Sequence, residues 1–407
     1  MKLKRNKNLH ALRIGEDRMR YKKKHKQQNT AMWKVVTGVL AVMLATMTCL
    51  YIYSLANPQQ KALPSTQQSQ PTESRQSTED SAKAAPLSLW TDTAKLKKEL
   101  TSFVSDVTKL GGENYIPVKN RVAVFDFDGT LFCETDPCSL DYRLLRYRVT
   151  EDPDYKDRAS LFEREVAGKI ERYINGESVD GLEVDHGKAI ASAFSGMTVD
   201  EFEEYVDKFR RQPSPSYQNM TNGQGFYQPM LQVIRYLQDN DFTVYVISDS
   251  DRLFVRGVCK GVLNLPDSHI IGSDESLVAD HQMGADGLDY QYSKDDKLIL
   301  GGDFLVKNLR MNKVSVIARE IGVQPVLSFG NSSGDTSMAN YTITNNPYKS
   351  AAYMLCCDDT VRENGDLKKA QEMEASCKEN GWTAVSMKKD WLTIYGDSVK
   401  RITEKTN

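Results

Sequence analysis

Two carboxylates stand one residue apart at the end of an apolar segment. Asp126 and Asp128 follow residues 122–125 directly, and Gly129 and Thr130 come next. In extended backbone, side chains two positions apart point the same way, so both carboxylates can face one group while the phenylalanine between them faces away. Such a pair can act on a phosphoryl group, whose transfer needs a nucleophile in line and neutralised oxygens. Adjacent carboxylates also repel each other, so a cation is expected beside them.

Polar clusters follow three apolar segments of the chain, "VAVF-DFDGT", "VYVIS-DSD" and "PVLSF-GNSSGD". One Asp-x-Asp pair occurs in ordinary turns, but the same change of polarity after three expected core strands is a stronger signal. In open α/β sheets, ligands bind beyond the C-terminal ends of the strands. The three clusters therefore predict one shared site at that edge.

The elements that would position this site alternate between strand and helix patterns. Segments 242–248 and 325–330 are apolar runs typical of buried parallel strands. The alternation predicts an α/β fold with a doubly wound parallel sheet. We also expect helices at 91–110, 251–262 and 312–322, strands at 269–274, 341–346 and 351–357, and a hairpin or loop over 286–302.

Residues 132–229 form a long, mostly helical insertion between the first two of these strands. One helix is expected to start at Thr198, because Glu201 follows three residues later in a capping-box pattern. We therefore predict a catalytic core over 90–131 and 230–407, with 132–229 as a helical cap.

The sequence resembles the haloacid dehalogenase superfamily of phosphatases and phosphotransferases. "DFDGT" matches the first motif of that family, and "VYVIS", ending in Ser248, matches the second. Lys313, at an expected helix start 18 residues before Asn331, matches the third motif. "FGNSSGDTSM" resembles the fourth, and the likeness covers about residues 115–360.

This resemblance implies roles for the motif residues. Asp126 is the nucleophile that forms an aspartyl-phosphate, and Asp128 protonates the leaving oxygen and then activates water. Ser248 and Lys313 hold the phosphate oxygens. Further contributions are expected from the sharp turn at Gly129, the orienting hydroxyl of Thr130 and the backbone N–H groups of Gly129 and Asp249.

The resemblance also implies Mg²⁺, held by Asp126, the backbone carbonyl of Asp128 and a side chain of the fourth motif. Here the sequence departs from the family pattern, because Asn331 stands where an aspartate usually falls. Either Asn331 is the ligand and Asp335 supplies charge from behind it, or Asp335 binds directly.

Several neighbouring residues have plainer interpretations. Lys297 and Lys307 are alternatives to Lys313. Glu134 and Asp136 either contact the substrate or belong to an ordinary loop. The charges of Asp249, Asp251 and Arg252 fit a solvated helix start, and the acids of 357–363 fit an exposed turn unless they reach the cap or substrate.

The insertion resembles the caps of phosphoserine-phosphatase-like members, and the second and fourth motifs more loosely resemble a phosphorylcholine-phosphatase branch. A cap of this kind should close over a small phosphate ester. Its aromatic residues either cage a choline-like cation or belong to the core; they are Tyr142, Tyr147, Phe162 and Tyr173.

The N-terminal region has a different composition. Residues 1–34 hold twelve Lys and Arg against two acids, which leaves 41 basic and 53 acidic residues and argues against nucleic-acid binding there. Residues 35–56 carry no charge and, at ~1.5 Å each, can cross a bilayer. The basic flank predicts a single-pass signal anchor with its tail in the cytoplasm, where the tail can contact anionic lipid. Residues 57–89 have the composition of a disordered stalk, which would place the catalytic domain outside the cell membrane.

Two functions follow from these patterns. The first is a Mg²⁺-dependent phosphomonoesterase tethered outside the membrane. The alternative is a binding or scaffold protein on an inactive form of the same fold, because of Asn331. Six cysteines lie beyond the anchor, as disulfides or buried thiols.

Overall fold

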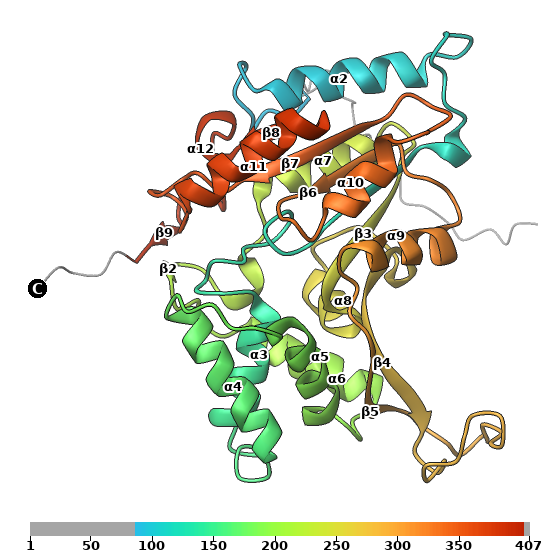
Figure 1. The fold of residues 1–407 in the computed structure, drawn as a ribbon, viewed down its shortest axis with the longest axis vertical. Coiled ribbons are helices and arrows are strands. Elements are labelled where there is room, and N and C mark those ends of the chain that lie inside the picture. The colour runs from blue at the N-terminus through green and yellow to red at the C-terminus, as the bar shows by residue number, and fades with distance from the viewer. Residues whose placement is uncertain (1–85, 403–407) are drawn as a thin grey trace, which may run out of the picture. The chain divides into compact units, whose positions relative to one another are not determined.

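The computed structural model describes residues 86–402, which are built around one seven-stranded sheet (Figure 1). The strand order is β5-β4-β3-β1-β6-β7-β8, and every neighbouring pair is parallel except β4 with β5. The α/β class with a mostly parallel sheet is therefore confirmed. The strands are β1 (Val122–Phe125), β3 (Thr243–Asp251), β4 (Ile270–Ala279), β5 (Leu298–Val306), β6 (Leu327–Gly330), β7 (Ala351–Cys356) and β8 (Thr383–Ser386).

Helices cover both faces of this sheet, because the side chains of its buried strands alternate between two cores. Ala123 and Phe125 of β1 pack into one core, whereas Val122 and Val124 pack into the other. The first face carries α2 (Lys95–Thr108), α7 (Gln228–Gln238) and α8 (Arg252–Cys259). The second carries α9 (Met311–Val316), a π-helical turn (Ile317–Ile321), α10 (Thr336–Ile343) and α11 (Leu367–Asn380).

Four of the five α-helices between β1 and β3 form a group of their own, below the sheet in Figure 1. The predicted helix start at Thr198 is confirmed, because its hydroxyl accepts from the Glu201 N–H at 3.2 Å and Glu201 accepts from the Thr198 N–H at 2.8 Å. Ser160 and Glu163 form a second capping box. These helices are α3 (Leu140–Thr150), α4 (Leu161–Ile174), α5 (Leu182–Ala193) and α6 (Val199–Arg210).

The antiparallel pair β4–β5 forms an arm whose tip, residues 280–297, projects at the lower right of Figure 1. The region left open as a hairpin or loop is thus the end of a hairpin. The arm joins the helical group, since the Leu300 N–H donates to the Met197 carbonyl at 2.9 Å. Gly187 of α5 packs so closely on Phe304 that an added Cβ would lie 2.5 Å from the ring.

Two parts of the C-terminal half differ from the prediction. Residues 341–346 are not a strand, because α10 runs to Ile343. Met338 and Ala339 bury one side of this helix, and the Thr342 hydroxyl donates to the Met338 carbonyl at 2.9 Å, so packing outweighs the β propensity of the segment. The second difference is a set of elements that the sequence patterns do not predict: α11, α12 (Met387–Asp390), β8 and the pair β2 (Tyr217–Gln218) and β9 (Lys400–Arg401).

The predicted tail, the predicted membrane anchor at 35–56 and most of the predicted stalk lie outside the described residues. Within residues 86–402, none of the helices is long and apolar enough to cross a bilayer. Residues 86–89 had been assigned to the stalk, but Leu87 is buried in the core and the Leu89 N–H donates to Gln232 at 2.9 Å. All six cysteines of the described region are free thiols.

Candidate active site

Asp126, Lys313 and Asp335 meet at the C-terminal edge of the sheet. The Lys313 Nζ lies 2.5 Å from Asp126 Oδ1 and 2.7 Å from Asp335 Oδ1, and all three side chains are buried. Burial disfavours the charged lysine, but the two carboxylates outweigh it and raise the pKa of Lys313 above its ordinary value. The lysine is therefore a fixed cation beside the predicted nucleophile.

Asp128 points to the end of β3. Its Oδ2 accepts from the Ser250 hydroxyl at 2.6 Å, whereas its Oδ1 is buried with no hydrogen-bond partner among the described residues. Burial, with the carboxylates of Asp141 and Asp249 adding to it, raises the pKa of Asp128 well above the usual range. A raised pKa is what a carboxyl group needs to donate a proton near neutral pH.

The loop after β6 is held by Asp335. Its Oδ2 accepts from the N–H groups of Asn331 and Ser332, both at 3.1 Å, while its Oδ1 faces Lys313. The Asn331 amide is more open: its Oδ1 accepts from Thr130 at 3.3 Å and its Nδ2 donates to Glu134 at 2.8 Å. Both oxygens of Asp335 are therefore engaged by the protein, and the amide oxygen of Asn331 faces the turn after β1.

Gly129 makes this approach between the first and fourth motifs sterically possible. Its φ is +72°, which disfavours residues with a Cβ, and an added Cβ would lie 1.9 Å from the Asn331 Nδ2. Thr130 is fully buried, and its hydroxyl lies 3.4 Å from Asp126 Oδ2 as well as near Asn331. It thus bridges the first and fourth motifs and does not contact Asp128 in the recorded hydrogen bonds.

Ser248 and Asp249 lie near the end of β3, just beyond Val246, which is the last β3 residue that pairs with β1. The Ser248 side chain is buried, and its Oγ accepts from the Ser250 N–H at 3.0 Å. Asp249 forms an ion pair with Lys307 at 3.1 Å. Lys307 therefore neutralises Asp249, and Lys297 lies on the arm beside Asp280. Of the three candidate lysines, Lys313 alone contacts Asp126.

The helix start after β3 is not a solvated patch, contrary to one interpretation of its charges. Asp251 is 7% exposed and caps α8 by accepting from the Phe254 N–H at 2.9 Å. Arg252 pairs with Asp274 at 2.7 Å and with Glu320 at 2.8 Å. These charges fix the end of β3, and with it the position of Ser250.

Glu134 and Asp136 have different surroundings. Burial, followed by repulsion from Asp249 and Asp335, raises the pKa of Glu134 to about 7, and its carboxylate contacts Asn331. Asp136 accepts from Ser214 at 2.8 Å and pairs with Arg143 at 3.1 Å, so it joins two connecting segments. Glu134 lies at the site, and Asp136 belongs to the structure beside it.

The acids in the turn at 357–363 are buried, although the turn also carries the exposed Val361. The Glu363 side chain accepts from the hydroxyls of Thr135, Tyr217 and Tyr395 and is fully buried. It therefore joins the loop after β1, the segment after α6 and the C-terminal region. Of the two interpretations of this turn, the one in which an acid reaches toward the cap holds for Glu363, which contacts Thr135 and Tyr217.

The cap aromatics do not form one cage. Tyr147 packs on Phe209 with ring centroids 5.4 Å apart, and Phe162 is 38% exposed. Tyr142 lies 4.3 Å from the His186 ring and 6.0 Å from that of Tyr173. These contacts are packing within the helical group.

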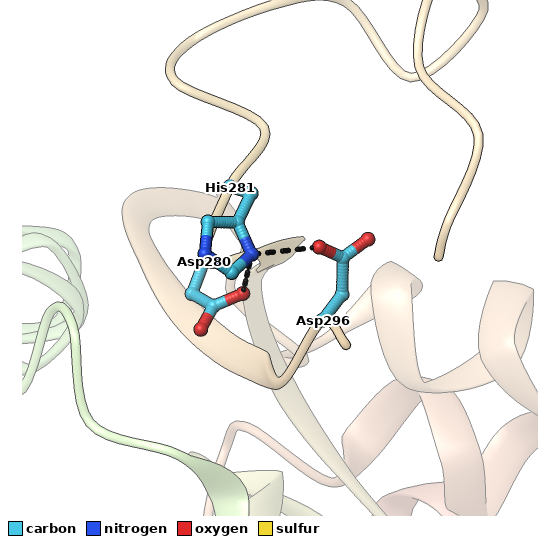
Figure 2. A group of neighbouring side chains, drawn as sticks. All are labelled: Asp280, His281 and Asp296. Carbon is cyan, nitrogen blue, oxygen red and sulfur yellow. Dashed lines mark hydrogen bonds and ion pairs between the residues drawn. The ribbon is translucent and has the colours of Figure 1, made fainter. Parts of the chain in front are cut away.

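A second cluster of ionisable groups lies at the tip of the arm, and Figure 2 shows that its side chains converge. The His281 Nδ1 lies 3.0 Å from Asp280 and 2.9 Å from Asp296. Asp296 also accepts from the Tyr290 hydroxyl and from the Ser293 N–H. Its oxygens are thus satisfied by the loop, and the cluster stabilises the arm tip.

The donor set at the sheet edge fits a magnesium ion. Mg²⁺ prefers oxygen ligands and commonly binds one or two carboxylates while it keeps several waters. The unpartnered Oδ1 of Asp128 is a buried acceptor that lacks a donor. Acidic groups outnumber ammonium groups here, four to two; they are Asp126, Asp128, Asp249 and Asp335 against Lys307 and Lys313.

The model of the family described as haloacid dehalogenase-like hydrolase matches residues 123–340, more than half of the chain. The chain therefore belongs to this family of hydrolases, and the resemblance carried by its four motifs is confirmed. No curated protein matches the sequence significantly.

Solved structures similar to this one include a functionally unknown protein from Anaerococcus prevotii (13% identity, 75% of this chain and 97% of that chain, TM-score 0.44). Others are cytosolic 5′-nucleotidase IIIB bound to cytidine (12%, 72% and 86%, TM-score 0.43) and a substrate-bound phosphoserine phosphatase (16%, 58% and 86%, TM-score 0.32). These TM-scores are below 0.5, so no conclusion on substrate follows from them.

Sequence reasoning missed two residues near the site. Ser250, which donates to Asp128, was not among the predicted site residues. Asp141 of α3 raises the pKa of Asp128 by its negative charge, but it lies in an ordinary helical pattern thirteen residues further on. The alternation of β3 offered a signal for Ser250, since it points to the same side as Ser248; no comparable signal exists for Asp141.

Proposed function

We propose that the protein is a Mg²⁺-dependent phosphomonoesterase that hydrolyses a small phosphate ester through an aspartyl-phosphate. The observation that carries this proposal is the pairing of Asp126 with Lys313 at the sheet edge, beside a second carboxyl group, Asp128, which accepts from the Ser250 hydroxyl at 2.6 Å. The first carboxylate is a nucleophile with a fixed counter-charge, and the second is a proton donor.

The reaction has two balanced steps. Asp126 attacks phosphorus, the bond to the ester oxygen breaks, and Asp128 transfers its proton to the departing alcohol. Asp128, now ionised, takes a proton from water, whose oxygen attacks the aspartyl-phosphate and releases phosphate with Asp126 restored. Lys313 remains beside Asp126 and offsets the charge on the phosphoryl oxygens, and the Ser248 hydroxyl supplies a further donor. The Gly129 N–H, expected from the sequence to contribute, instead donates to the Phe132 carbonyl at 2.7 Å.

Asp126, Asp128 and Asn331 would hold the metal, with Asp335 behind them. Bound there, the ion would neutralise charge on the transferring phosphoryl group. Asp335 is assigned to the loop and to Lys313 because both of its oxygens are engaged. Asn331→Ala should therefore raise the Mg²⁺ concentration needed for half-maximal activity by about tenfold, whereas the exposed neighbour Ser333→Ala should not; equal values would reject Asn331 as a ligand.

The proposal includes a location. Residues 35–56 form a single-pass anchor, the basic tail stays in the cytoplasm, and the catalytic domain lies outside the cell membrane with its helical cap over the site. Protease added to intact cells should then remove the domain, and an epitope at the N-terminus should survive until the cells are opened. The reverse pattern would reject this orientation.

Activity itself is tested with the full-length chain and p-nitrophenyl phosphate. Turnover should need Mg²⁺, stop with a chelator and fall at least about a thousandfold in Asp126→Asn, because the nucleophile is lost. The exposed arm variant Asp289→Asn is the matched control and should behave as wild type. A folded chain without turnover of any phosphate ester would favour the scaffold alternative.

A further inference from the structure

A narrow pocket opens beside the candidate active site, between the helical group and the arm. His186, Gly187 and Ile190 of α5 form one wall, and Phe304 and Lys307 of the arm side form another. The floor comes from the end of β3 and the middle of β4, where four carboxylates lie: Asp249, Asp251, Asp274 and Glu275. The space admits a group about the size of one water molecule.

Three of the four carboxylates are already matched. Asp249 pairs with Lys307, Asp274 pairs with Arg252, and Asp251 accepts from the Phe254 N–H. Glu275 differs. The residue is only 8% exposed, yet both of its buried oxygens lack a hydrogen-bond partner among the described residues. A buried carboxylate without donors is costly, so this side chain marks a missing cation or donor.

A second unpartnered carboxylate lies behind the His186 wall. Asp141 is 1% exposed, and neither of its oxygens has a hydrogen-bond partner in the described part of the chain. Its Oδ2 lies 3.8 Å from the His186 Nδ1, and burial lowers the pKa of that histidine, which is therefore neutral. Within residues 86–402, no lysine or arginine forms an ion pair with Asp141 or Glu275, so both favour a positive ligand.

The pocket and the phosphate-handling residues share one strand end. Asp249 and Asp251 line the pocket, while Ser250, which lies between them in the chain, donates to Asp128. A short molecule with a phosphate at one end and a cation at the other can therefore occupy both places.

We propose that this pocket binds a primary ammonium group of the substrate, so that the preferred ester is a short aminoalkyl phosphate. This rests on the proposed phosphatase function and adds the substrate class to it. A primary ammonium has three donors and suits the unpartnered Glu275. A trimethylated ammonium exceeds the space, and a substrate carboxylate would meet four acids.

The test compares 2-aminoethyl phosphate with 2-hydroxyethyl phosphate, which has the same length without the charge. In the full-length chain, kcat/KM should favour the amine by about tenfold or more, because hydrogen bonds to charged groups are the stronger ones. Glu275→Gln should bring the ratio near one, chiefly through KM, and leave the hydroxyl ester within about twofold. Asp289→Asn should keep the wild-type ratio.

Binding to the Asp126→Asn chain, measured by calorimetry, separates this inference from the proposed function. Tighter binding of the aminoethyl ester there supports the pocket even if no ester is hydrolysed. Equal binding and equal turnover of the two esters would overturn it, as would a preference that survives both Glu275→Gln and Asp141→Asn. An N,N,N-trimethyl analogue that matches the primary amine would also overturn it.

Discussion

Buried carboxylates occur in two kinds of place in this molecule. Glu363 and Asp296 are surrounded by donors: the first accepts from three hydroxyls, and the second from Tyr290, Ser293 and His281. Asp128, Asp141 and Glu275 are equally enclosed, but five of their six oxygens have no partner in residues 86–402. The first group joins loops to the fold, and the second lies around the site and its pocket.

The contrast separates structural from functional acids. Burying an acceptor costs free energy unless the acceptor is hydrogen-bonded. Several buried acceptors without partners therefore indicate a place where a bound ligand can supply the missing donors. Removing a satisfied carboxylate should therefore weaken the fold. Removing an unsatisfied one should weaken the chemistry and leave the fold intact.

The largest expected effect is that of Asp128→Asn. The change removes the proton donor, so kcat/KM with p-nitrophenyl phosphate should fall about a thousandfold, within the range of general acid–base catalysis. Urea unfolding without Mg²⁺ should give a free energy of unfolding equal to or above that of wild type, because an unmatched buried acid becomes a neutral amide. A loss of more than ~2 kcal/mol of stability would contradict the contrast.

Glu363→Ala should have the opposite profile. Three buried hydroxyls lose their acceptor, so the free energy of unfolding should fall by about 3 kcal/mol. Urea titration measures this, and the exposed Glu372→Ala, which lies on α11, is the control that should change it little. A Glu363→Ala chain as stable as wild type would remove Glu363 from the structural group.

Gly129→Ala changes the spacing of the site without removing an acid. The added Cβ meets Asn331 and is held at a positive φ, so stability should fall by about 1–2 kcal/mol for the backbone strain alone, and activity should fall further as Asn331 is displaced. Gly284→Ala has a similar φ of +80° with open space around it and is the matched control for strain. Equal activity in the two variants would mean that the close approach to Asn331 is unimportant.

The smallest expected effect concerns His281. Its hydrogen bond to Asp296, and then the charge of Asp280, raise its pKa above the ordinary value of 6.5. A raised folded-state pKa stabilises the fold below the unfolded value, and this contribution is lost as pH rises through the folded value. His281→Gln should therefore lower Tm more at pH 5.5 than at pH 8.5, and a larger loss at the higher pH would contradict this sign.

The sequence predicted which side chains gather at the C-terminal edge of the sheet, because local geometry determines it. Asp126, Asp128 and Asn331 follow strands directly, and parallel strands bring their ends to one edge. The helix with Lys313 could be placed for a similar reason, since Gly322 ends it at a φ of +69°. These features depend on strand period and caps, which short windows of sequence contain.

The pocket and the structural acids could not be predicted in this way. Glu275 and Phe304 oppose each other only because β4 and β5 form a long hairpin, and the sequence left that region open. Glu363 looked like part of an exposed turn, because its partners Tyr217 and Tyr395 are distant in the chain. In the same way, the packing of Met338 turned an expected strand into α10.

The central claim is that Asp126 becomes phosphorylated during turnover. The full-length chain should be mixed with Mg²⁺ and a phosphate ester, quenched in acid and treated with borohydride, which reduces an aspartyl-phosphate to homoserine. Mass spectrometry of the peptide that contains residue 126 should then find homoserine at that position. Asp128→Asn chains kept without substrate are the control and should contain no homoserine there. Steady turnover with Asp126 unmodified under every quench time would contradict the proposed mechanism.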